Sequence, residues 1–176
     1  MLKGEKINLR LIQKRDLEEY IALESDLDIR GEFVPHRVRS EVGFKKRFEE
    51  TGFWSDDGGT MLIVSKDDQI LGQIAFFKPA RYFDALELGY VLYHKASRGK
   101  GYTSEAVRLF SRYLFATKKI NRLQLGVSPE NIASRRVAEK SGYVSEGILR
   151  GAIYFGGKNH DVEMFGLLRS DMNQEA

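Results

Sequence analysis

Short segments in which apolar residues alternate with polar ones, or in which β-branched residues gather, recur along this chain and predict strands. They lie at 6–12, 61–65, 70–77, 86–92, 123–127, 143–149 and 161–168. The polar stretch Lys-Asp-Asp-Gln at 66–69 separates the second segment from the third and indicates a hairpin. The pattern therefore predicts about seven strands.

Apolar residues three or four positions apart predict about four helices in the remaining segments. One helix covers 16–24, and a second begins after Ser40, whose side chain is suited to cap it. A third covers 101–117, and a fourth lies near 133–138, with Gly142 at the place of a C-terminal cap. The order β-α-α-β-β-β-α-β-α-β-β predicts an α+β fold in which helices pack on a mixed central sheet. The chain has no internal repeat, low-complexity run or linker, so we expect residues 1–176 to form a single domain.

The composition of the chain excludes several kinds of functional site. The absence of cysteine excludes disulfides, thiolate zinc sites and a cysteine nucleophile, and it fits a reducing cytoplasm. No signal peptide or membrane span is visible, so we expect a cytoplasmic protein with no membrane partner. The three histidines are scattered, so no metal is predicted. Basic and acidic residues, 28 and 25 in number, are interspersed, which disfavours nucleic-acid binding but leaves a net charge of +3 for a phosphate-bearing ligand.

The most informative segment joins a predicted strand to a predicted helix and reads Arg98-Gly99-Lys100-Gly101-Tyr102-Thr103-Ser104-Glu105-Ala106. Its glycines let the main chain turn sharply, and the helix start directs unpaired N–H groups at the loop. Such a loop suits a pyrophosphate. It fits neither the Walker pattern nor the dinucleotide fingerprint, since neither spacing of glycines is present. A tight strand-to-helix turn without a ligand is the alternative interpretation.

The segment also resembles the Arg/Gln-x-x-Gly-x-Gly/Ala loop of the GNAT superfamily of N-acetyltransferases, with Thr103 as a departure where Gly or Ala is usual. The strand Glu87-Leu88-Gly89-Tyr90-Val91-Leu92 looks like that family's central strand. The helix from Asn131-x-x-Ser134 to Gly142-Tyr143 is similar to the helix that follows it. The combination looks most like the branch that contains the ribosomal-protein N-terminal acetyltransferases.

This resemblance implies a sheet that splays between its fourth and fifth strands to admit acetyl-coenzyme A. It implies that the loop Arg98, Gly99, Lys100, Gly101, Tyr102, Thr103 and Ser104 binds the pyrophosphate. The pantetheine would pair with the strand edge at Leu92 and Tyr93. Asn131 would contact the pantetheine arm, and Ser134 would lie near the thioester sulfur.

Acetyl transfer to an amine needs a base for the ammonium proton and a donor for the leaving thiolate. Glu87 is the predicted base, acting through a water, and a solvent-facing carboxylate on a half-exposed strand is the alternative. Ser134 is the predicted proton donor, and a hydroxyl bonded to its own helix backbone is the alternative. Asp161 and Glu163 are candidates to shape the amine pocket, with a structural role as the alternative.

The predicted function is transfer of acetyl from acetyl-coenzyme A to a primary amine, on a protein N-terminus or a small molecule. A module that binds acyl-coenzyme A without turnover is the alternative. The acceptor would contact residues 25–59 and 149–161, but neither segment carries a motif that names it. A homodimer is a possibility that the sequence leaves open.

Overall fold

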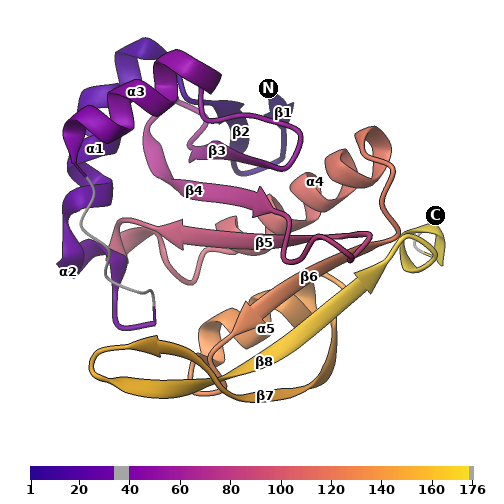
Figure 1. Ribbon diagram of the computed structural model, residues 1–176. Coiled ribbons are helices and arrows are strands. Elements are labelled where there is room, and N and C mark those ends of the chain that lie inside the picture. Colours follow the sequence, from indigo (N-terminus) through magenta and orange to yellow (C-terminus); the bar gives the residue numbers. More distant parts are fainter. Residues whose placement is uncertain (34–39, 175–176) are drawn as a thin grey trace.

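A computed structural model describes residues 1–33 and 40–174 of the chain. Within these residues, eight strands form one mixed sheet in the order β1-β2-β3-β4-β5-β6-β8-β7 (Figure 1). The strands are β1 (Leu2–Lys3), β2 (Asn8–Leu11), β3 (Gly58–Val64), β4 (Ile70–Phe77), β5 (Ala85–Leu92), β6 (Arg122–Val127), β7 (Val144–Phe155) and β8 (Lys158–Leu168). Seven of them fall on the predicted segments. The eighth, β1, has only two residues and is too short for a periodic signal to reveal.

In the described part of the chain, five α-helices accompany the sheet, one more than predicted. They are α1 (Leu17–Ser25), α2 (Leu27–Arg30), α3 (Glu41–Thr51), α4 (Tyr102–Thr117) and α5 (Ile132–Lys140). The additional helix, α2, is a single turn. The Asp26 carboxylate caps it by accepting from the N–H groups of Asp28 and Ile29. The predicted cap of α3 is confirmed, because Ser40 Oγ accepts from the Gly43 N–H at 3.1 Å.

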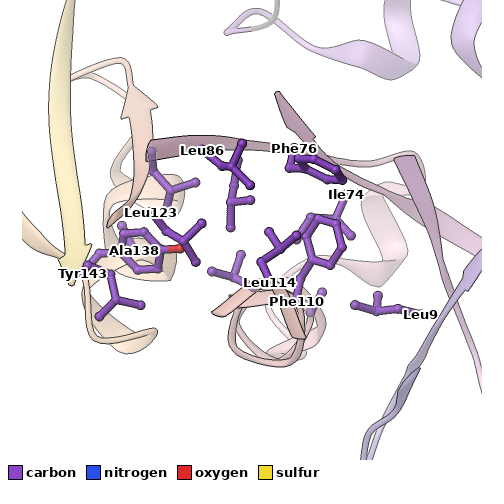
Figure 2. Close-up of a cluster of buried hydrophobic side chains, with 14 of the residues drawn as sticks. Leu9, Ile74, Phe76, Leu86, Phe110, Leu114, Leu123, Ala138 and Tyr143 are labelled. Atoms are coloured by element: carbon purple, nitrogen blue, oxygen red, sulfur yellow. The ribbon is translucent and has the colours of Figure 1, made fainter. Parts of the chain in front are cut away.

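The alternation of side chains along β5 divides the core into two parts. Leu86 and Leu88 face α4 and α5, in a cluster with Phe110 of α4 and Ala138 of α5. Figure 2 shows this cluster, with Phe110 and Leu114 beside the strands. Residues one position out of phase, Val91 and Tyr93, face the other side of the sheet. There they join a second cluster with side chains of α1 and α3.

The sheet opens between β5 and β6, the fourth and fifth of the predicted strands, which confirms the predicted splay. These two strands pair in parallel only from Ala85–Arg122 to Leu88–Leu125. Beyond that level β6 continues along β8, while β5 continues along β4 (Figure 1). The N–H and C=O groups of alternate residues point to opposite sides of a strand. Since Tyr93 N–H is bonded to Leu71 O in β4, the main-chain groups of Tyr90 and Leu92 point into the opening.

The two C-terminal strands are longer than predicted. The predicted segments 143–149 and 161–168 become one hairpin of β7 and β8, which turns at Gly156 and Gly157. Both glycines have positive φ, of 58° and 81°, as a tight hairpin turn requires. Residues 150–160 lack regular apolar alternation, so the pattern ended the strands too early, although the Gly-Gly pair is itself a hairpin signal.

Across the part of the chain that the structure describes, no helix combines the length and apolar character needed to cross a membrane. The cytoplasmic location expected from the sequence stays a prediction.

Candidate active site

The glycine loop has the conformation that an anion site needs. Gly99 and Gly101 adopt φ of 75° and 81°, in the left-handed region that other residues avoid. Gly101 is the N-cap of α4, and its carbonyl accepts from Glu105 N–H at 3.1 Å. The N–H groups of 102–104 precede that first helical bond, so the helix itself supplies them with no acceptor. The loop therefore presents a row of main-chain donors at the positive end of α4.

Contacts from the N-terminal segment hold this loop in place. Lys6 Nζ donates to the carbonyl oxygen of Lys100 at 3.3 Å. The Glu105 carboxylate, in the first turn of α4, accepts from the main-chain N–H groups of Glu5 and Lys6, the latter at 3.1 Å. Sequence reasoning missed both Lys6 and Glu105, because these contacts join residues almost 100 positions apart.

The loop opens into a cavity of about 1190 Å³ that runs from α4 to the start of α5. Most of the predicted cofactor residues line it together: Leu92, Arg98, Gly99, Gly101, Tyr102, Thr103, Ser104 and Asn131. The predicted proton donor Ser134 lines it with them. Tyr90, which the sequence did not single out, lines it as well. Residues of β5, the glycine loop and α5 therefore meet in one cavity. Each of these three segments carries one of the motifs on which the family resemblance is based.

Two predicted residues stand apart from the lining. The Lys100 ammonium lies 6.0 Å from the centre of the Tyr102 ring. Tyr93 is buried in the second core cluster, where its hydroxyl donates to Glu24 at 2.9 Å. Its N–H is used by β4, as described above, so Leu92 rather than Tyr93 offers main-chain N–H to the opening.

The cavity carries an excess of positive charge. Seven basic residues line it, against three acidic ones, Glu5, Glu32 and Glu105. The basic residues are Lys3, Lys6, Arg98, Arg108, Arg112, Arg136 and Lys140. A concave surface with this balance attracts a ligand with several phosphate groups.

In the lining of the cavity, the first turn of α5 holds Ser134 beside Tyr90. Asn131 Oδ1 caps the helix by accepting from Ser134 N–H at 3.0 Å. The hydroxyls of Ser134 and Tyr90 are 2.6 Å apart. Burial raises the pKa of Tyr90 to about 12, and the bond to Ser134 opposes that rise. Both hydroxyls therefore remain protonated at neutral pH and form a polar pair at the edge of the opening.

Glu87 lies on the other face of the sheet, where β5 and β6 are still paired. It is half-buried, and its Oε2 accepts from Gln124 Nε2 at 2.8 Å. Burial raises the pKa of the Glu87 carboxyl, and the Gln124 bond opposes the rise. The register puts Gly89 and Gly126 next on this face, so neither strand places a side chain between Glu87 and the opening. Glu87 lines neither cavity, and its role as a base that acts through a water stays a prediction.

The other acidic candidates bind within the hairpin and to α5. Asp161 Oδ1 accepts from Gly151 N–H at 2.8 Å. The buried Glu163 accepts from Ser145 Oγ at 2.7 Å, and its Oε2 is 2.7 Å from Arg135 Nε. These contacts support the structural alternative for both residues.

A second cavity, of about 770 Å³, adjoins the first. Glu32 and Phe33 line both cavities, and the rest of the second is formed by Glu130 and by the hairpin residues Ala152, Ile153, Tyr154, Phe155, Gly156, Lys158 and His160. Both segments predicted to contact the acceptor contribute to it.

Among the described residues, no three His, Asp or Glu side chains gather to hold a metal ion, and His36 lies outside them.

Comparison with known proteins gives a family match over most of the chain. Residues 6–144 match the family model described as "Acetyltransferase (GNAT) domain". The chain is 32% identical to a probable N-acetyltransferase of Bacillus subtilis (strain 168), YjcK, over 99% of this chain and 100% of that protein. It is 29% identical to the putative ribosomal N-acetyltransferase YdaF of the same organism, over 69% of this chain and 66% of that protein.

Among solved structures, the fold is similar to that of spermidine N-acetyltransferase from Vibrio cholerae in complex with coenzyme A and spermine. The TM-score is 0.82 and the sequence identity 17%, with 96% of this chain and 98% of that chain covered. At this identity the likeness shows the fold alone.

Proposed function

Since the chain belongs to the GNAT family of acetyltransferases, we propose that it transfers acetyl directly to a primary amine, without a covalent enzyme intermediate. It is an acetyl-coenzyme-A-dependent N-acetyltransferase, and family membership favours this over a binding module without turnover. The observation that carries the proposal is one continuous cavity that joins the anion loop of α4 to the Tyr90–Ser134 pair.

Acetyl-coenzyme A supplies the activated acetyl group, and the residues of the cavity fit its parts. The main-chain donors from Gly99 to Ser104 suit the pyrophosphate, with Lys100 contributing its amide rather than its side chain. The pantetheine would extend the sheet along the free edge of β5 at Leu92, which Tyr93 holds through its bond to β4. Asn131 would border the pantetheine arm, and Ser134 would lie at the sulfur.

The chemistry requires groups on both sides of the opening. Glu87 would accept the ammonium proton through a water, and the amine nitrogen would then attack the thioester carbon. Main-chain N–H groups that point into the opening, such as that of Leu92, are suited to stabilise the oxyanion. When the C–S bond breaks, its electron pair goes to sulfur, and the Ser134 hydroxyl would donate a hydrogen bond to the departing thiolate. The nitrogen would release its second proton to water, which leaves a neutral amide.

Ser134→Ala tests the donor role. We expect kcat to fall about tenfold while acetyl-coenzyme A affinity changes less than twofold, because the lost hydrogen bond forms as the thiolate departs. Steady-state kinetics and calorimetry measure the two quantities. The chain offers a matched control in Ser111→Ala, since Ser111 Oγ also lies 2.8 Å from a tyrosine hydroxyl, that of Tyr143, but inside the core. Full turnover by the Ser134 variant would make its hydroxyl structural.

The acceptor amine would bind in the second cavity. Glu32 and Glu130 line this cavity, and their carboxylates suit an amine that arrives protonated. The names of the relatives suggest two acceptor classes, ribosomal proteins for YdaF and a polyamine for the Vibrio enzyme. A panel of peptides with free N-termini and small amines, assayed for thiol release from acetyl-coenzyme A, distinguishes the classes. Mass spectrometry of the product identifies the acetylated nitrogen. Thiol release that does not depend on any amine would indicate a hydrolase and contradict the proposal.

A homodimer stays a prediction, for which sedimentation is the direct test.

A further inference from the structure

Within residues 1–33 and 40–174 there are two serine–tyrosine hydroxyl pairs, and only one of them borders the cavity. Ser111 and Tyr143 are both buried in the core between α4 and α5. Ser134 and Tyr90 both line the 1190 Å³ cavity at the point where β5 leaves β6. A core pair needs no explanation beyond satisfying two buried hydroxyls. The pair at the cavity sits where the proposed function puts the thioester sulfur.

We propose that Tyr90 is a positioning residue, which donates its phenolic hydrogen bond to Ser134 Oγ and so directs the Ser134 proton to the thioester sulfur. This inference rests on the proposed function, because it assumes that the sulfur lies at Ser134. It adds to that function a residue that acts through Ser134 and that the family motifs did not indicate.

The number of available protons determines which hydroxyl must donate in this pair. A serine hydroxyl has one proton, so Ser134 cannot donate to Tyr90 and to sulfur at once. The Tyr90 hydroxyl is 2.6 Å from Ser134 Oγ and 3.4 Å from the Ser134 carbonyl oxygen, so both acceptors within its reach belong to Ser134. With Tyr90 as donor, Ser134 Oγ keeps its own proton for the sulfur. With the bond reversed, the sulfur would receive none.

The surroundings keep the Tyr90 hydroxyl protonated and therefore able to donate. Burial raises the pKa of its phenol to about 12, so the hydroxyl stays protonated over the range in which acetyltransfer to an amine is measured. Both hydroxyls also stand on rigid elements. Tyr90 belongs to β5, which is paired with β4 at this level, and Ser134 N–H is fixed by Asn131 in the first turn of α5. A pair held in this way has its geometry before substrate binds.

The reaction step needs no proton from Tyr90. As the tetrahedral intermediate collapses, the C–S bond breaks and its electron pair goes to sulfur. The ammonium proton has already passed to the base, the nitrogen releases its second proton to water as the amide forms, and the thiolate leaves with a hydrogen bond from Ser134. Tyr90 donates a hydrogen bond throughout and ends the step as it began, a neutral phenol.

The kinetic test compares Tyr90→Phe with Tyr143→Phe, which removes the hydroxyl of the core pair. We expect Tyr90→Phe to lower kcat about tenfold with less than a twofold change in KM for acetyl-coenzyme A. Tyr143→Phe should leave kcat unchanged. In the Ser134→Ala background, Tyr90→Phe should have no further effect, since Tyr90 acts only through Ser134. Losses that multiply in the double variant would overturn the proposal.

A binding measurement separates this role from general packing. The affinity of coenzyme A, divided by that of desulfo-coenzyme A, should rise about tenfold as the pH is raised through the free thiol pKa near ~8.5, because the Ser134 hydrogen bond favours the thiolate. Groups elsewhere in the cavity affect both ligands equally. In Tyr90→Phe the rise should shrink to about twofold, whereas Tyr143→Phe should keep it. If Tyr90→Phe retains both the rise and kcat while Ser134→Ala loses them, the inference is wrong and the proposed function stands. If neither ligand binds at the loop, the proposed function itself fails.

Discussion

Replacing Glu87 with glutamine is expected to lower kcat near neutral pH by about two to three orders of magnitude, the range that general base catalysis commonly supplies. An acceptor amine arrives mostly as an ammonium ion, which has no lone pair for attack. Glutamine keeps the size of the side chain and the contact with Gln124 but cannot take up the proton. The affinity for acetyl-coenzyme A should barely change, because Glu87 does not line the cavity of the cofactor.

The native enzyme and Glu87→Gln should also differ in how kcat depends on pH. A base must be ionised, so kcat of the native enzyme should rise with pH through the Glu87 pKa, and burial sets that pKa above the usual carboxyl range. The glutamine variant should lack this acidic limb. It should recover part of its activity at high pH, where free amine becomes abundant. Initial rates at saturating substrates from pH 5 to 10 measure both effects.

The fold provides an internal control for this variant. A carboxyl whose folded pKa is raised contributes stability below its unfolded pKa and loses it as pH rises through the folded pKa. At neutral pH the ionised Glu87 therefore does not support the fold, and Glu87→Gln should be at least as stable thermally as the native protein. Glu139→Gln, on the exposed side of α5, controls for loss of a negative charge. A uniform loss of kcat at every pH would instead indicate that Glu87 positions the substrate.

The parts of the site that the sequence predicted are those encoded by neighbouring residues. The glycine turn before α4, the helix near 133–138 and the alternation of β5 are local patterns, and each was found where expected. The family resemblance added that these three segments form one site, which their separation along the chain does not reveal. The residues lining the cavity are consistent with that expectation.

The parts that the sequence did not predict depend on contacts between distant residues. Lys6 supports the loop through the carbonyl of Lys100, and Tyr90 meets Ser134 across 44 positions. No local sequence pattern marks either residue as part of the site. Tyr90 also fits the apolar alternation of Leu86 and Leu88, so pattern analysis counts it as one more core side chain. Only the packing of α5 against β5 reveals that its hydroxyl reaches the cavity.

Gly101→Val should have the largest effect on the cofactor, weakening coenzyme A binding about 100-fold, which corresponds to about 2.7 kcal/mol. Gly101 adopts φ of 81° and ψ of 5° as the N-cap of α4, a conformation that costs a β-branched residue about 1–3 kcal/mol. Space is not the obstacle, because an added Cβ would lie 3.6 Å from Lys6 Nζ, an ordinary contact. To relieve the strain the loop would rotate, and the N–H groups of 102–104 would no longer converge on one phosphate position.

A glycine with similar strain elsewhere separates this local effect from loss of the fold. Gly52 ends α3 with φ of 59° and has open space around its Cβ position, so Gly52→Val imposes comparable strain away from the loop. Both variants should remain folded by circular dichroism, with melting temperatures lowered by several degrees, on the order of 5 °C. Calorimetry should then find coenzyme A binding weakened only in Gly101→Val. Because main-chain donors at the start of α4 are the basis of the proposed pyrophosphate site, unchanged affinity in this variant would remove the phosphates from the loop.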